Sequence, residues 1–125
     1  MRVSVKRGAA IIAFLLAGCA GDPGGDAGGG LEQGWGLMLA KEYPAARDHY
    51  EGMLVEFPTN PYVHLNLGVA YQRLGNRDLA RQHYEAAIAH GAEAEVTRVV
   101  KEGEVAPSVT TVADQARDNL LTLSG

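Results

Sequence analysis

The stretch that decides the fold is residues 61–94, PYVHLNLGVAYQRLGNRDLARQHYEAAIAHGAEA. It holds two helical patterns, which are separated by a break at Gly75 and Asn76. Asn60 can cap the first helix, and Pro61 suits its first position because that position needs no N–H donor. Gly75 suits the left-handed position that follows a helix end, and Asn76 suits the next N-cap. The stretch therefore predicts two helices joined by a tight turn.

Apolar residues line one face of each predicted helix. The first helix carries Leu65, Leu67, Val69 and Leu74 around a central glycine, Gly68. The second helix, which we expect to end at Gly91, has apolar residues at i, i+1, i+5, i+8 and i+9, namely Leu79, Ala80, Tyr84, Ala87 and Ile88. Small residues at 68 and 80 let the two helix backbones approach closely.

An internal repeat with a period of 34 residues extends this hairpin toward the N-terminus. The residues that recur at that offset include the pairs Gly34/Gly68, Ala46/Ala80, His49/His83 and Tyr50/Tyr84. In the first unit, residues 27–60, Pro44 opens a good second helix and Phe57-Pro58 closes it. The first helix of this unit is rich in glycine, which costs about 1 kcal/mol per interior position, so we expect it to cover only residues 31–41.

The period and the residue types resemble the tetratricopeptide repeat, whose unit is a helix A, a tight turn and a helix B. The residues that carry the resemblance are Gly34, Ala46, Tyr50, Pro58, Leu67, Gly68, Tyr71, Ala80, Tyr84 and Ala87. The resemblance implies an all-α solenoid in which two helix-turn-helix units occupy residues 31–94.

The repeat is lost after residue 94. Val96, Arg98 and Val100 alternate with polar residues, which predicts an extended segment or a loose loop. Thr111 and Asp114 then form a capping-box pattern. The helix that follows has Ala113, Ala116, Leu120 and Leu123 on one face. Because stacked repeats usually need three or more units, we interpret residues 95–125 as a loop and a helix that caps the second unit.

The N-terminus has the layout of a secretory signal peptide. Three basic residues lie in the first seven positions, and residues 8–17 form an apolar run too short to span a bilayer of about 30 Å. At the end of this run, Leu16-Ala17-Gly18-Cys19 resembles the lipobox of bacterial lipoproteins. That resemblance implies cleavage after residue 18, a diacylglycerol on the Cys19 thiol and an acyl chain on its amino group. An ordinary secretory signal, or a buried helix with a chance cysteine, is the alternative.

Cleavage would leave a lipidated Cys19 on a tether formed by residues 19–30. The segment GDPGGDAGGG at 21–30 has no large side chain to bury, so it is predicted to be flexible. The loss of three of the eleven basic residues would change the net charge from −4 to −7. Ala20, rather than aspartate, follows the cysteine, which in the lipoprotein family favours the outer membrane.

Composition and motifs argue against several functions. The acidic charge disfavours nucleic-acid binding, and a single cysteine excludes a disulfide framework. The common hydrolase, zinc and redox motifs are missing from the sequence, so we expect no enzyme, metal, cofactor or small-molecule substrate. The only candidate catalytic groups are His49, His64, His83 and His90. His83 and His90 are about 10.5 Å apart along one helix, too far to share an ion. His64 lies where the family often has tryptophan, which favours a packing or helix-surface role.

The resemblance further implies a groove, lined by helix A of each unit, that binds peptides. Its positions fall on Trp35, Met38, Leu39, Tyr62, Leu65, Val69, Gln72 and Arg73. Leu65 and Val69 replace the lysine and asparagine of the family's carboxylate clamp, which favours an apolar partner surface. Trp35 and Leu39 could equally fill the core of the short first unit, and both interpretations stay open.

Together these features predict a lipid-anchored scaffold or accessory factor that binds a protein or peptide in the bacterial cell envelope. Its expected location is the periplasmic face of the outer membrane, and the resemblance suggests pilus, secretion or outer-membrane assembly as settings. A second interpretation is a structural or regulatory subunit whose incomplete helical array is completed by a partner. An envelope enzyme or ligand carrier has only the four histidines in its favour.

Overall fold

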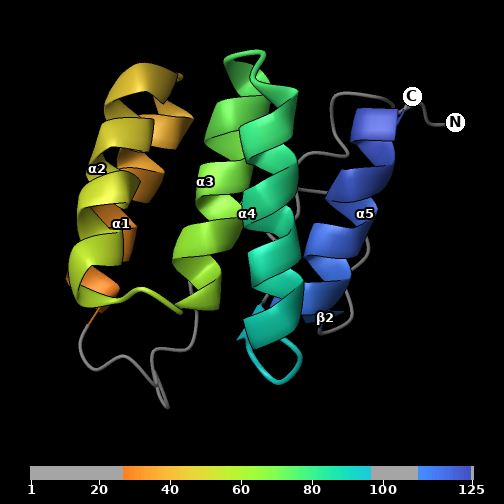
Figure 1. The fold of residues 1–125 in the computed structure, drawn as a ribbon. Coiled ribbons are helices and arrows are strands. Elements are labelled where there is room, and N and C mark those ends of the chain that lie inside the picture. Colours follow the sequence, from red (N-terminus) through yellow and green to blue (C-terminus); the bar gives the residue numbers. More distant parts are fainter. Residues whose placement is uncertain (1–26, 97–109, 125) are drawn as a thin grey trace, which may run out of the picture.

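The computed structural model describes residues 27–96 and 110–124, and these residues form five α-helices and one pair of two-residue strands (Figure 1). Several predictions concern residues outside this part of the chain. They include the signal peptide, the lipidated Cys19, the tether up to residue 26, and the alternating Arg98 and Val100.

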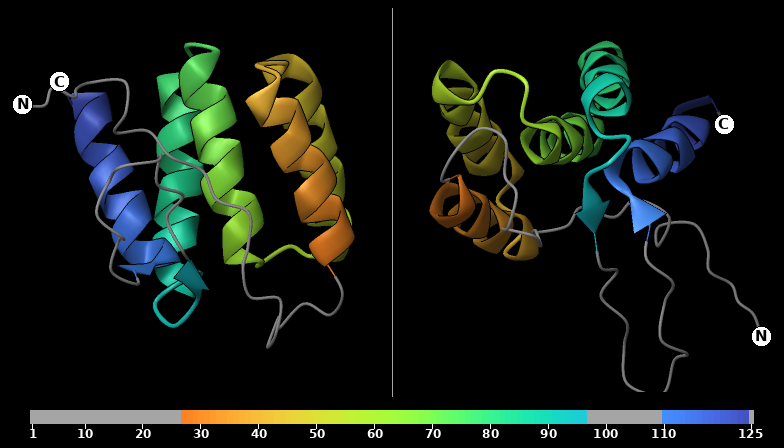
Figure 2. Two further views of the ribbon diagram at one scale, coloured as in Figure 1. Left: turned by 180° about the vertical axis from the view of Figure 1, so that it is seen from behind. Right: turned by 90° about the horizontal axis from the view of Figure 1, so that it is seen from below.

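The helices form two layers. The first unit consists of α1 (Gly28–Leu39) and α2 (Tyr43–Glu56), the second of α3 (Pro61–Arg73) and α4 (Arg77–His90), and α5 (Val112–Ser124) follows. Helices α1, α3 and α5 lie side by side in one row, which we call the A row, and α2 and α4 lie behind it (Figure 2). Helix α3 is central, since it contacts all four other helices. The predicted all-α repeat architecture is confirmed.

The second unit begins and turns at the predicted residues. The side-chain oxygen of Asn60 accepts hydrogen bonds from the backbone N–H groups of Tyr62 (2.9 Å) and Val63 (3.2 Å). Asn76 caps α4 in the same way through the N–H of Leu79. Gly75 has a φ of +89°, the left-handed conformation that glycine adopts without a steric penalty. These contacts confirm the predicted helix ends.

A glycine and a tyrosine from neighbouring helices meet at the same place in both units. A Cβ atom built on Gly68 would lie 2.5 Å from Cδ1 of Tyr84, and one built on Gly34 would overlap the ring of Tyr50. Both tyrosines are fully buried. The glycine and the tyrosine therefore recur together, because only glycine on α1 or α3 leaves room for the tyrosine ring against the helix backbone.

Helix α1 differs from the prediction at both ends. It begins at Gly28, three residues before the expected start, and it ends two residues early, ahead of Lys41. The carbonyl of Gly30 accepts a hydrogen bond from Nε2 of His49 at 2.7 Å, and a Cβ at that glycine would lie 2.7 Å from Cε of Met53. Packing against α2 thus outweighs the poor helix propensity, and assigning residues 28–30 to the tether was wrong.

Helix α5 closes the array, as predicted. The hydroxyl of Thr111 accepts a hydrogen bond from the backbone N–H of Asp114 at 3.1 Å, and α5 packs against α3 and α4. Its inner face buries Ala113, Ala116 and Leu123, and its outer face exposes Asp114, Arg117, Asp118 and Leu121.

Two short strands precede α5. Strand β1 (Glu95–Val96) pairs antiparallel with β2 (Thr110–Thr111), with Glu95 opposite Thr111. The prediction of an extended segment is confirmed at residues 95 and 96, but the pairing with residues 110 and 111 was not foreseen. The pair brings the start of α5 back to the end of α4.

Candidate functional site

The predicted partner-binding residues fall on α1 and α3 of the A row, and the first unit shows three degrees of burial. Met38 is buried, Trp35 is half-buried against the core, and Leu39 is 66% exposed. Core packing, one of the two interpretations left open for Trp35 and Leu39, fits the buried part of Trp35, and Met38 is a core residue as well. Leu39 projects its side chain into solvent, where a partner could reach it.

The second unit buries most of its predicted positions. Helix α3 is buried along residues 61–71, so Tyr62, Leu65 and Val69 belong to the hydrophobic core. The hydroxyl of Tyr62 also donates a hydrogen bond to the carbonyl of Glu95 at 2.7 Å. The physical reason is the central place of α3, which is packed against helices on several sides. A ligand would have to displace packed groups to touch these three side chains.

The last two predicted positions lie near the end of α3. Arg73 is exposed, whereas Gln72 is half-buried and connects three helices. Its amide oxygen accepts a hydrogen bond from the hydroxyl of Tyr84, and its amide nitrogen donates one to the hydroxyl of Thr122, both at 2.7 Å. Gln72 therefore positions α5 against α3 and α4. Leu39 and Arg73 are the two exposed members of the predicted set.

A cluster that the sequence analysis missed lies between α2, α3 and α4. Nδ1 of His64 lies 3.0 Å from Nδ1 of His83, and Nε2 of His64 lies 2.8 Å from the carbonyl oxygen of Pro58. The two imidazole rings stack at a centroid distance of 5.3 Å. Nε2 of His83 faces a carboxylate oxygen of Glu51 at 3.9 Å. We call His64 and His83 the histidine pair.

A tyrosine completes this cluster. The ring of Tyr71 stacks on that of His83 with centroids 5.6 Å apart and planes 5° apart. Its hydroxyl donates a short hydrogen bond of 2.5 Å to Glu51. Burial and the neighbouring Glu51 raise the pKa of Tyr71 to about 12, so the phenol keeps its proton at neutral pH.

Burial also changes the ionisation of the histidine pair. His64 is only 8% exposed, and desolvation lowers its pKa, although the hydrogen bond to Pro58 and the charge of Glu51 oppose this effect. Desolvation lowers the pKa of His83 as well, followed by repulsion from His64. Both rings are therefore neutral at pH 7 in the folded protein.

Neither the repeat, which matches His83 with His49, nor the helix of His83, which also carries His90, indicates this pair. A usable signal was present in the sequence. Antiparallel helices A and B bring together residues on either side of their turn, as Gly68 and Tyr84 show. His64 and His83 flank the turn at Gly75 in a similar way.

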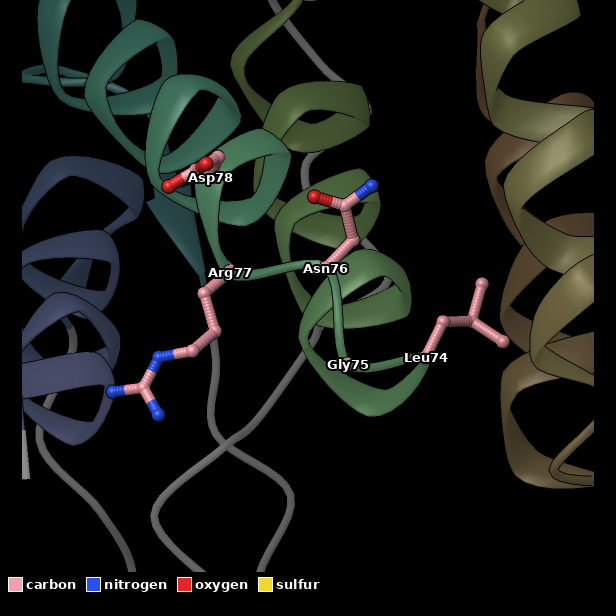
Figure 3. Close-up of a pocket in the computed structure, with 5 residues that line it drawn as sticks. All are labelled: Leu74, Gly75, Asn76, Arg77 and Asp78. Carbon is pink, nitrogen blue, oxygen red and sulfur yellow. The ribbon is translucent and has the colours of Figure 1, made fainter.

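The cluster does not gather metal ligands. Across residues 27–96 and 110–124, no group of three or more histidine, cysteine, aspartate or glutamate side chains could hold a metal ion. A shallow depression at the α3–α4 turn is lined by Leu74, Gly75, Asn76, Arg77 and Asp78 (Figure 3). The side chains of Leu74, Asn76 and Arg77 point in different directions there, so they do not converge on a ligand. In the part of the chain that is described, no helix is long and apolar enough to cross a membrane.

Comparison with known proteins identifies one family. A family model described as the tetratricopeptide repeat matches residues 37–101, which is more than half of the 125-residue chain. The chain matches no curated protein and no solved structure. The matched region includes all of α2, α3 and α4.

Proposed function

Because this chain belongs to the tetratricopeptide repeat family, we propose that it is a protein-interaction module tethered to a membrane by lipid on Cys19. Repeats of this kind are interaction modules, and their stacked helices form extended binding surfaces. Nothing in the matched family points to catalysis. The observation that carries the proposal is the A row, in which α1, α3 and α5 lie side by side (Figure 2) and Leu39 and Arg73 are exposed near the ends of α1 and α3.

The accessible side chains of the A row determine what it could bind. Leu39 supplies an exposed apolar side chain and Arg73 an exposed cation, while the half-buried Trp35 offers an aromatic edge on α1. Aromatic residues and arginine are enriched at the centres of protein interfaces. A peptide that carries an apolar anchor and a nearby carboxylate would match this combination.

The lipid anchor is supported by the sequence. Basic residues, a short apolar run and a lipobox-like Leu16-Ala17-Gly18-Cys19 occur in the order that lipoprotein processing requires. One acyl chain gives only marginal membrane binding, whereas the three chains of a mature lipoprotein would hold the protein durably. Ala20 at the second mature position supports an outer-membrane location facing the periplasm. An accessory role in pilus, secretion or outer-membrane assembly is the setting that this location favours.

A second function has its own observation. Within residues 27–96 and 110–124, the array contains two complete units and then α5, whereas solenoids of this type usually stack three or more units. The protein would then be a structural or regulatory subunit, and a partner would extend the array. In that case the isolated domain would gain substantial stability on binding, because the partner would cover its exposed ends.

Site-specific photocrosslinking tests the first proposal. A photoreactive residue at Leu39, on the A row, should crosslink to a protein in native envelopes. The matched control is Val55 on α2, which is 84% exposed but lies in the other layer. Equal crosslinking at both positions would contradict the proposed face. Acyl labelling that Cys19→Ala abolishes would support the anchor, and labelling that persists in this variant would exclude it.

A further inference from the structure

We propose that the histidine pair is a proton-sensitive joint between α3 and α4 of the second unit: it accepts one proton beside Glu51, and a second proton separates the two rings. The proposal rests on the contacts of His64 and His83 and is independent of the membrane anchor and of the binding face.

The hydrogen bonds define the tautomers of the neutral pair. The carbonyl of Pro58 can only accept, so Nε2 of His64 must carry its proton and donate it over 2.8 Å. Nδ1 of the neutral His64 ring is then an acceptor. Nδ1 of His83, 3.0 Å away, must therefore be the donor. This leaves Nε2 of His83 without a proton, on the side that faces Glu51.

The first added proton has a favourable position. It binds Nε2 of His83, where the carboxylate of Glu51 lies 3.9 Å away and forms an ion pair with the new imidazolium. The hydrogen bond between the two Nδ1 atoms survives, because His83 remains its donor. The Glu51 side chain is 43% exposed, so solvent screens this attraction and it offsets only part of the desolvation cost.

The second proton has no favourable position. The one remaining acceptor is Nδ1 of His64, and its protonation would place two N–H donors face to face across 3.0 Å. Two cationic rings stacked at 5.3 Å would also repel each other. The rings must therefore separate, which loosens α3 from α4.

The other charged and titratable groups near the pair do not change the order in which the two histidines are protonated. Among the side chains of α2, only Glu51 favours protonation of the histidine pair. Arg47 and Asp48 affect the pKa of Tyr71 rather than those of the histidines. From α4, His90 disfavours a charge on His64. Tyr71 of α3 stays neutral and keeps its hydroxyl on Glu51.

The first unit supplies an internal comparison. His49 occupies the repeat position of His83, but the position equivalent to His64 is Gly30. Nε2 of His49 donates to the carbonyl of Gly30, a bond that both the neutral and the protonated ring can make. Acid therefore acts on the second unit and spares the contact between α1 and α2.

The direction of the pH effect follows from the lowered pKa values. Unfolded histidine takes up its proton near pH 6.5, whereas the folded pair takes up protons only at lower pH. Stability is therefore full above about pH 6.5 and is lost as the pH falls through the folded pKa values. Each proton that the unfolded chain binds in excess raises the unfolding equilibrium constant about tenfold per pH unit.

Urea unfolding of the full chain in a mild nonionic detergent, followed by circular dichroism between pH 8 and pH 5, tests the joint. The double variant His64→Gln/His83→Asn keeps amide donors near Pro58 and near residue 64 but cannot titrate. We expect the rise in the unfolding constant below pH 6.5 to shrink by at least tenfold in this variant. His49→Gln is the matched control and should keep the wild-type pH dependence. An unchanged pH dependence in the double variant would overturn the proposal.

A measurement on the unaltered chain keeps the proposal testable if the double variant fails to fold. Nitrogen–proton correlation spectra of the imidazoles should show a proton on Nε2 of His64 and on Nδ1 of His83 at pH 8. Acid titration should proceed in two steps below pH 6.5, with His83 first. The ring-current shift that Tyr71 imposes on His83 should disappear at the second step. Opposite tautomers, or independent titration of both rings at pH 6.5, would refute the joint.

Discussion

The Cβ position of Gly68 lies 2.5 Å from Cδ1 of Tyr84, closer than any methyl group could approach a ring without displacing it. Gly68→Ala should therefore destabilise the domain by about 1–3 kcal/mol, the usual cost of overpacking, even though alanine is the better helix former. The change in the free energy of unfolding in urea measures this effect.

The control for that substitution lies in α1. Gly36 is exposed, and its Cβ position has no heavy atom within 4 Å, so Gly36→Ala adds helix propensity without a clash. We expect it to stabilise the domain by about 0.5–1 kcal/mol. A stabilising Gly68→Ala would show that the close contact with Tyr84 does not hold the second unit together.

Lys41 occupies a position where the second unit has glycine. Its φ is +62°, and its equivalent 34 residues later is Gly75 with a φ of +89°. A left-handed conformation costs a residue with a Cβ about 1–2 kcal/mol. Lys41→Gly should therefore raise the free energy of unfolding by about 1 kcal/mol, and Gly75→Ala should lower it by a similar amount. Thermal unfolding of both variants checks the two signs, and a Lys41→Gly variant that is less stable than the wild type would contradict the prediction.

Gln72 joins α5 to the second unit through its two amide hydrogen bonds. Gln72→Ala removes both bonds and leaves the hydroxyl of Tyr84 without its acceptor, so we expect a loss of about 1–3 kcal/mol. Amide hydrogen exchange should accelerate most in α5. Gln82→Ala is a suitable control, because Gln82 is exposed on α4, and it should leave exchange in α5 unchanged. Uniform acceleration along the chain would mean that Gln72 does not hold α5 specifically.

Much of the fold could be predicted because its local signals agree with one another. The capping role of Asn60, the left-handed Gly75 and the spacing of Ala80, Tyr84 and Ala87 all indicate the same helical hairpin, and the structure confirms it. Helix α1 was placed less accurately. Its glycines oppose a helix locally, and contacts with His49, Tyr50 and Met53 of α2 hold them in one.

The candidate site was harder to predict, since burial depends on neighbours that a single helix does not reveal. Tyr62, Leu65 and Val69 occupy the groove-facing pattern of one helix, yet the structure buries them because α3 lies at the centre of the domain. Likewise, the histidine pair joins residues 19 positions apart on two different helices. Neither result follows from the periodicity of one helix.

The central claim, that the A row binds a protein partner, is tested most directly by comparing two surface charge substitutions. After a crosslinked partner is identified, its Kd for the wild type, Leu39→Asp and Val55→Asp should be measured by calorimetry. The side chains of Leu39 and Val55 are both largely exposed, so neither substitution should unfold the domain. We predict that Leu39→Asp weakens binding at least tenfold, since a charge would be buried at the interface, and that Val55→Asp leaves the Kd within twofold. Equal Kd values for the wild type and Leu39→Asp would contradict the account.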